Sequence, residues 1–283
     1  MSSLPRSTLI KWGSAALSLV WLAVYVWFYL TNPFGGAAYD YADNWGLDLL
    51  TFFPAVAAAG MATLVALQFQ PGEAPRRIWL TFAVGWWCWV GGEIAGMIYD
   101  YFYWDTSYPE LTLIDLLWTT GYLFFGLALF YQFQTVYAEQ ERKSAKLYLA
   151  LCAAALLLTL GLAYAARRNH LGEGVSNFAL YLAILYPVFD LIEGGAALWL
   201  FLLFRRGKWG RPWWGLIAFA IADSISIYFW IGGDETLSKQ IVQALYLFSD
   251  TTYVAGYLIV ALAFLSHYYM LQWPPNATLS DRA

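Results

Sequence analysis

Six acidic residues lie inside stretches of the sequence that are otherwise apolar, and no Lys or Arg accompanies them there. An ionisable side chain in such a stretch is costly and usually marks a polar site. Four tyrosines, two in repeated Gly-Tyr-Leu motifs and two following acids, add hydroxyl groups that can bind carboxylates. We predict that these acids and tyrosines form one ligand-binding site: Glu93, Asp115, Asp190, Glu193, Asp223, Asp250, Tyr99, Tyr122, Tyr228 and Tyr257.

Carboxylic acids in apolar surroundings support three kinds of chemistry, which the residues alone leave open. They can be protonated and hydrogen-bonded between helices as structural links. They can bind a cation or a cationic ligand, and neighbouring aromatic rings favour an organic one. One of them can also donate a proton to a substrate. In an enzyme we expect Glu93 and Asp223 to be the acids.

Other chemistries have little support in the sequence. The only histidines are His170 and His267, and the only cysteines are Cys88 and Cys152, both in apolar runs. We therefore predict no metal site and no cofactor. No arrangement of Ser, His and Cys suggests a hydrolase, and no basic face suggests nucleic-acid binding.

The composition predicts an all-α integral membrane protein. Hydrophobic residues make up 61% of the 283 and charged residues 12%, whereas a soluble domain is about half apolar and a quarter charged. At about 20 residues per membrane-spanning helix, eight helices fit the chain. The expected spans are 10–31, 47–69, 78–102, 112–137, 147–166, 177–204, 213–231 and 238–270.

The distribution of basic residues predicts the orientation. Twelve of the 15 Lys and Arg residues lie at the two ends of the chain or in the loops after the even-numbered spans. Loops rich in Lys and Arg stay in the cytoplasm. We expect both termini to be cytoplasmic and the protein to lie in the cell inner (plasma) membrane, where the lipid bilayer surrounds it.

A duplicated segment predicts two similar halves. Residues 115–129 and 250–264 both begin with Asp and carry Gly-Tyr-Leu after five further residues, with an aromatic residue three positions after the Asp. Glu93 similarly matches Asp223, and Asp48 loosely matches Asp190. We expect two parallel four-helix repeats, 1–140 and 141–283. Thr112 and Asp115 have capping-box spacing and should start the fourth span.

The chain resembles the multi-pass (eight-span) N-terminal membrane sensor module of bacterial and archaeal PAS, diguanylate-cyclase and histidine-kinase signalling proteins. The similar residues are Gly92-Glu93, Tyr99, Thr112-Leu-Ile-Asp115, Gly121-Tyr122 and Tyr186-Pro187-Val-Phe-Asp190-Leu191. Thr112 stands in place of the module's Ser and Leu123 in place of a Pro, while Pro109 is out of register. The resemblance implies a sensory or ligand-binding role.

The predicted function is thus a membrane sensor or ligand-binding module with an acidic, aromatic-lined cavity in the extracytoplasmic half. Its expected ligand is a small cationic or amphipathic molecule. About a dozen residues follow the last span, so we expect signalling through a membrane-protein partner. Two alternatives stay open: an enzyme that protonates a lipid-soluble isoprenoid or terpenoid substrate, and an accessory subunit of a larger membrane complex.

Overall fold

The computed structural model describes residues 6–31, 45–103, 111–136, 141–168, 174, 176–203, 211–230 and 237–272. Eight α-helices and one short 3-10 helix make up nearly all of this described part. The bounds of the helices lie within a few residues of the expected spans, which confirms an all-helical fold. The helices are α1 (Arg6–Thr31), α2 (Trp45–Ala66), α3 (Ala74–Tyr103), α4 (Leu113–Val136), α5 (Glu141–Arg168), α6 (Asn177–Leu203), the 3-10 helix η3 (Arg211–Trp213), α7 (Trp214–Trp230) and α8 (Lys239–Gln272).

The start of α4 forms the predicted capping box. The Thr112 backbone N–H and hydroxyl both donate to the Asp115 carboxylate, at 2.8 and 2.7 Å. The Asp115 N–H approaches the Thr112 hydroxyl oxygen at 3.4 Å. These contacts satisfy N–H groups that have no partner within the first turn of a helix. Asp115 is thereby fixed in position at the first turn.

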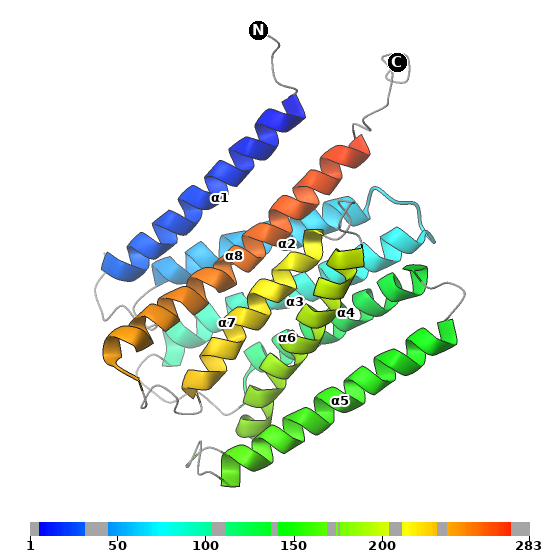
Figure 1. Cartoon of the computed structure of the whole chain (residues 1–283). Coiled ribbons are helices and arrows are strands. Elements are labelled where there is room, and N and C mark those ends of the chain that lie inside the picture. The colour runs from blue at the N-terminus through cyan, green and yellow to red at the C-terminus, as the bar shows by residue number, and fades with distance from the viewer. Residues whose placement is uncertain are drawn as a thin grey trace, which may run out of the picture.

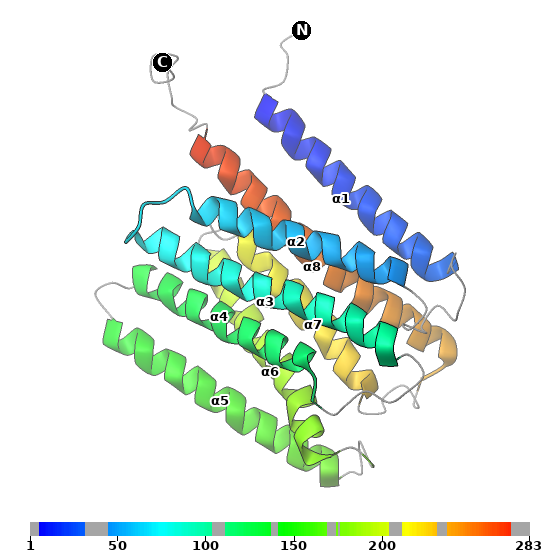
Figure 2. The same cartoon turned by 180° about the vertical axis from the view of Figure 1, so that it is seen from behind.

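The helices form a bundle in which α1 and α5 occupy opposite edges (Figures 1 and 2). Between them, α3 packs against α2 and α4, α7 packs against α6 and α8, and α2 packs closely against α8. The first residues of α1 and the last residues of α8 lie at the same end of the bundle (Figure 1). A hydrogen bond of 2.6 Å from Gln272 to Gln68 links α8 to the end of α2 there.

A cluster of aromatic side chains fills the centre of the bundle. Trp86 packs against Phe125 and Trp89 against Phe219, both with ring centroids 4.7 Å apart. Such tilted and edge-to-face contacts add to the free energy of burying the rings. The fully or almost fully buried members are Trp79, Phe82, Trp86, Trp89, Phe125, Trp213, Phe219, Tyr257, Phe264 and His267. The polar site lies next to this cluster, and Trp89 belongs to both.

Two pairs of helices approach closely at glycines. A methyl group added to Gly121 on α4 would collide with Trp89 on α3, and one added to Gly85 would come within 2.5 Å of Phe125. In the pair of α7 and α8, a methyl group at Gly256 would lie 2.8 Å from Phe219. The absence of a side chain at these positions sets the separation of each pair, and thus the place of the acids farther along the same helices.

Length, composition and exposure indicate a membrane protein. Among the described helices, five are long and apolar enough to cross a bilayer, within Trp12–Thr31, Trp45–Ala66, Leu113–Thr135, Asn177–Leu200 and Lys239–Gln272. Large apolar side chains on the edge helices face outward, including Leu19 on α1 and Leu157 on α5, which are 68% and 70% exposed. A lipid environment would cover such surfaces.

Candidate functional site

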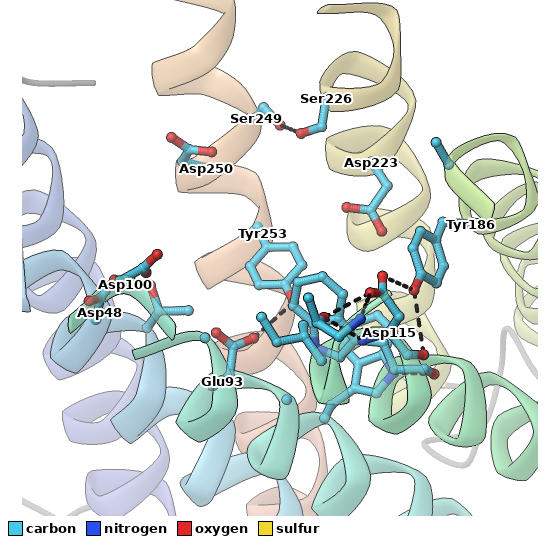
Figure 3. Close-up of a pocket in the computed structure, with 18 of the residues that line it drawn as sticks. Asp48, Glu93, Asp100, Asp115, Tyr186, Asp223, Ser226, Ser249, Asp250 and Tyr253 are labelled. Atoms are coloured by element: carbon cyan, nitrogen blue, oxygen red, sulfur yellow. Dashed lines mark hydrogen bonds between the residues drawn. The ribbon is translucent and has the colours of Figure 1, made fainter. Parts of the chain in front are cut away.

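A cavity of about 680 Å³ lies within the bundle and is lined by described residues from every α-helix except α5. It occupies the half of the bundle that contains the C-terminal part of α3 and the N-terminal parts of α4 and α8 (Figure 3). Its volume falls in the range of pockets that bind small molecules. Among the described residues, no Lys, Arg or His lines the cavity.

Carboxylates and aromatic rings alternate on the cavity wall. The six acids come from five helices and are Asp48, Glu93, Asp100, Asp115, Asp223 and Asp250. The six aromatic residues are Tyr25, Trp89, Trp118, Tyr122, Tyr186 and Tyr253. Small and apolar residues of α6, such as Ala183 and Pro187, complete the wall. The cavity wall is therefore acidic and partly hydrophobic.

Glu93 on α3 accepts hydrogen bonds from two tyrosines of α8. The hydroxyl of Tyr257 lies 2.6 Å and that of Tyr253 lies 2.9 Å from the same oxygen, Oε1. Each hydroxyl has its own hydrogen, so both can donate to Glu93 at once. Two donors on one oxygen are the arrangement expected for a carboxylate that carries a charge.

Asp223 on α7 has a different arrangement, because it shares one hydroxyl with a second acid. The Tyr122 hydroxyl on α4 lies 2.9 Å from Asp190 on α6 and 3.2 Å from Asp223. One hydroxyl carries a single hydrogen, so both contacts are full hydrogen bonds only when one of the two acids is protonated and donates to the phenol oxygen. This group of three residues is suited to hold one shared proton.

Both oxygens of the Asp115 carboxyl group accept hydrogen bonds from protein groups. Oδ2 accepts from Thr112, as described above, and Oδ1 accepts from the Tyr186 hydroxyl on α6 at 2.9 Å. Asp115 thus links α4 to α6 at the cavity wall (Figure 3).

Asp48 on α2 and Asp100 on α3 lie together on the opposite side of the cavity (Figure 3). Asp48 is within electrostatic reach of both Asp100 and Glu93. No basic side chain lies among the described residues around this pair. Two like charges that face each other in a partly buried place repel one another, and a bound cation would relieve that repulsion.

The structure brings most, but not all, of the sequence-predicted site residues together. Glu93, Asp115, Tyr122, Asp223 and Asp250 line the cavity. Asp190 and Tyr257 lie directly behind it, hydrogen-bonded to residues of the wall.

The other three predicted residues lie elsewhere. Glu193 is deeper in the protein and 5% exposed, and its Oε2 has no hydrogen-bond partner in the described structure. Tyr99 and Tyr228 are not among the lining residues, and Tyr228 is 40% exposed on α7.

Some lining residues were missed by sequence reasoning. Asp48 and Asp100 lie near ends of their helices, where acids are common and carry little signal. Tyr253 had a usable signal, because it is the aromatic residue three positions after Asp250 in the duplicated segment. Tyr186 likewise stands in the Tyr-Pro-x-x-Asp-Leu motif. Their hydroxyls prove to be donors to Glu93 and Asp115.

The histidines, cysteines and acids form no metal site within the described part of the chain. Among the described residues, no three His, Cys, Asp or Glu side chains stand close enough together to share a metal ion. His267 is fully buried in the aromatic cluster, next to Trp79 and Phe264. Cys88 is a free thiol on α3. His170 and the side chain of Cys152 lie outside the described part.

Comparison with known proteins adds no further constraint. No protein family, no curated protein and no solved structure matches this chain.

Proposed function

We propose that the protein is a membrane sensor or ligand-binding module whose cavity binds an organic cation and which acts through a membrane-protein partner. The observation that carries this proposal is the cavity wall: in the described part of the chain, six acidic and six aromatic residues surround about 680 Å³, and no basic side chain is among them. A cation entering this space meets attraction from several sides in a medium of low dielectric constant. Aromatic faces add cation–π attraction.

The spacing of the acids favours an organic cation over a bare ion. They are distributed over the walls of one cavity on α2, α3, α4, α7 and α8, with aromatic rings between them. A hard metal ion needs six or more oxygen ligands at about 2.3–2.6 Å, gathered around one point. A larger molecule can contact separated carboxylates and the rings between them at the same time.

The cavity would lie in the extracytoplasmic half of an eight-span protein with both termini in the cytoplasm. Basic residues support this orientation, because Arg76, Arg77 and Arg211 lie at the ends of helices remote from the cavity. Arg77 there packs over the ring of Tyr131 at 4.3 Å. The excess of Lys and Arg on that side agrees with the rule for cytoplasmic loops.

Two parallel four-helix repeats would form the cavity between them. Equivalent contacts support this arrangement. A methyl group at Gly85 on α3 would meet Phe125 on α4, and one at Gly215 on α7 would meet Val260 on α8. Gly215 follows Gly85 by 130 residues, and Val260 follows Phe125 by 135 residues. Glu93 and Asp223 share the first offset. The buried face of α2 also recurs on α6 after 135 residues, from Ala55, Ala58, Ala59, Ala62 and Val65 to Asp190, Glu193, Gly194, Ala197 and Leu200. This offset pairs Asp48 with Ala183 rather than with Asp190.

The cavity residues fit the same relation. Asp115 and Asp250, and likewise Trp118 and Tyr253, are 135 residues apart and all line the wall. Each half also supplies a hydrogen-bond donor to an acid of the other half, since Tyr257 donates to Glu93 and Tyr122 donates toward Asp223. A ligand in the cavity would therefore contact both repeats and could change how they pack, which is what a sensor requires.

Ligand binding to the purified protein in lipid nanodiscs tests the proposal. Phenethylammonium and butylammonium should raise the melting temperature, and above Kd the rise should follow the logarithm of their concentration, as for any ligand of the folded state. The double variant Asp48→Asn/Asp100→Asn should weaken this response at least tenfold, whereas Glu73→Gln, an exposed acid at the other end of α3, should not. A melting temperature unaffected by either amine would refute a cation-binding cavity.

A proton-donating enzyme is the second candidate, favoured by one observation. The pair of Asp190 and Asp223 around the single Tyr122 hydroxyl is suited to hold a proton, and Asp223 faces the cavity. Glu93, with two donors, is the poorer proton source. Incubation with polyprenyl substrates and analysis of the products would test this. Cyclised products that disappear in Asp223→Asn would favour the enzyme over the sensor.

A further inference from the structure

We infer that the ligand is an amphipathic monoamine, whose ammonium group binds at Asp48 and Asp100 and whose hydrocarbon chain lies along the α6 wall of the cavity. This inference rests on the proposed cation-binding function and specifies the class and the orientation of the ligand. It follows from a difference between the two ends of the cavity, because one end has carboxylates available to a ligand and the other does not.

The available carboxylates are those of Asp48 and Asp100. Both line the cavity, lie near each other, and have no basic neighbour among the described residues. Tyr25 and Thr51 stand beside them on the wall. An ammonium group has three N–H donors and no acceptor. It can therefore donate to both carboxylates together, and its charge offsets their mutual repulsion.

The acids at the other end already have donors from the protein. Asp115 accepts from Thr112 and Tyr186 on its two oxygens. Asp223 shares the hydroxyl of Tyr122 with Asp190. A second ammonium group would compete with these contacts, and the exchange of one set of hydrogen bonds for another gains little free energy.

The wall between and beyond those acids is mainly apolar where it is formed by α6. Ala179, Leu182, Ala183 and Pro187 line the cavity there, together with Tyr186, whose hydroxyl is bonded to Asp115. Under the 135-residue offset, Ala183 occupies the position that corresponds to Asp48. The first half thus presents a carboxylate where the second half presents a methyl group. Among its described residues, the cavity thus has carboxylates without protein donors at one end and a mainly apolar α6 wall at the other, which matches a molecule with a single charged head.

The hydrophobic end predicts how affinity depends on chain length. Each methylene group removed from water contributes about 0.8 kcal/mol, which is about a fourfold change in Kd. In a series of butyl-, hexyl- and octylammonium, each step adds two methylene groups and should lower Kd about 15-fold while the chain still fits. A cavity of about 680 Å³ has room for the whole series.

The test is a binding titration in nanodiscs with butyl-, hexyl- and octylammonium, 1,8-diaminooctane and 1-octanol as probes. Octylammonium should bind most tightly. The diamine should bind at least tenfold more weakly, because its second charge would lie against the α6 wall. Octanol, which has the chain but no charge, should not compete with octylammonium.

Exchanging Ala183 for a charged residue should reverse this preference. In Ala183→Asp, both ends of the cavity carry a carboxylate, so 1,8-diaminooctane should bind more tightly than octylammonium. In Ala183→Leu, which stays apolar but reduces the space, octylammonium should lose affinity and butylammonium should keep it. The control Ala196→Leu lies on α6 among core residues and not on the cavity wall, and should leave the order of the amines unchanged.

The outcomes separate this inference from the function on which it rests. If all amines bind but the affinity is independent of chain length, or if the diamine binds best to the unaltered protein, the amphipathic monoamine is refuted and the cation-binding cavity stands. If no amine binds, both are refuted. An unchanged order of affinities in a folded Ala183→Asp protein would also overturn the assignment of the α6 wall to the hydrocarbon chain.

Discussion

The hydroxyl of Tyr122 links three helices, and its removal should destabilise the protein measurably. Tyr122 is 3% exposed and its hydroxyl contacts Asp190 on α6 and Asp223 on α7. Tyr122→Phe deletes one oxygen and keeps the ring, which stacks on Tyr186 with centroids 5.9 Å apart. The change therefore isolates the polar contact from the packing.

The expected loss follows from the chemistry of the contact. A hydrogen bond to a charged group contributes about 1.5–3 kcal/mol, and a buried partner left without a donor loses a similar amount of free energy. Asp190 is itself 3% exposed, so water cannot replace the hydroxyl without a rearrangement. We expect Tyr122→Phe to lower the free energy of unfolding by about 2–3 kcal/mol.

The assay is reversible unfolding in mixed micelles, with Tyr131→Phe as the matched control. Tyr131 lies on the same helix, is half-buried, and keeps in the variant the ring that contacts Arg77. A double-mutant cycle with Asp190→Asn should give a coupling energy of about 1–3 kcal/mol. A Tyr122→Phe protein that is as stable as the control, or a coupling energy near zero, would contradict the shared-hydroxyl arrangement.

Two further predictions concern the elements that position the site. Gly121→Ala should lower the free energy of unfolding by about 1–3 kcal/mol relative to Gly161→Ala, because the added methyl group would meet the buried Trp89, whereas the one at Gly161 would meet nothing within 4 Å. The gain in helix propensity is common to both variants and cancels. Equal stabilities of the two variants in unfolding titrations would contradict the close approach of α3 and α4. Thr112→Ala should cost about 1 kcal/mol through loss of the α4 cap, and Thr112→Ser should restore most of it; an unaltered melting curve for the alanine variant would show that this cap does not hold Asp115.

Much of the fold could be predicted from the sequence because local signals determine it. Apolar runs of membrane length, interrupted by Pro, Gly and charged residues, give all eight helices nearly at their observed bounds. The capping box at Thr112 and Asp115 depends only on four successive positions and was predicted correctly. The crossing of the membrane by all eight helices and the two repeats stay predictions.

The candidate site was less accessible to sequence reasoning, because it depends on which faces of distant helices meet. Asp115 and Asp250 of the duplicated segments could be found because they lie in apolar runs, and the same holds for Glu93 and Asp223. Hydropathy gives no information on helix rotation, so Tyr228 was included in the site although it does not line the cavity. Asp48, noted only as a loose match of Asp190, and Asp100 were left out of the site. The contact between Glu93 and Tyr257 joins residues 164 positions apart and has no local signal.

The contact of Glu93 with α8 also has a consequence for the synthesis of the protein. The two tyrosines that donate to Glu93 follow it by 160 and 164 residues. At about 5–20 residues per second, the ribosome needs on the order of 10–30 s to add them. During that time the nascent chain holds an acid whose hydrogen-bond donors do not yet exist. Asp223, in contrast, follows Tyr122 and Asp190 and finds both in place when it is made. Helix α8 therefore completes the hydrogen bonding of Glu93 long after α3 itself has been made.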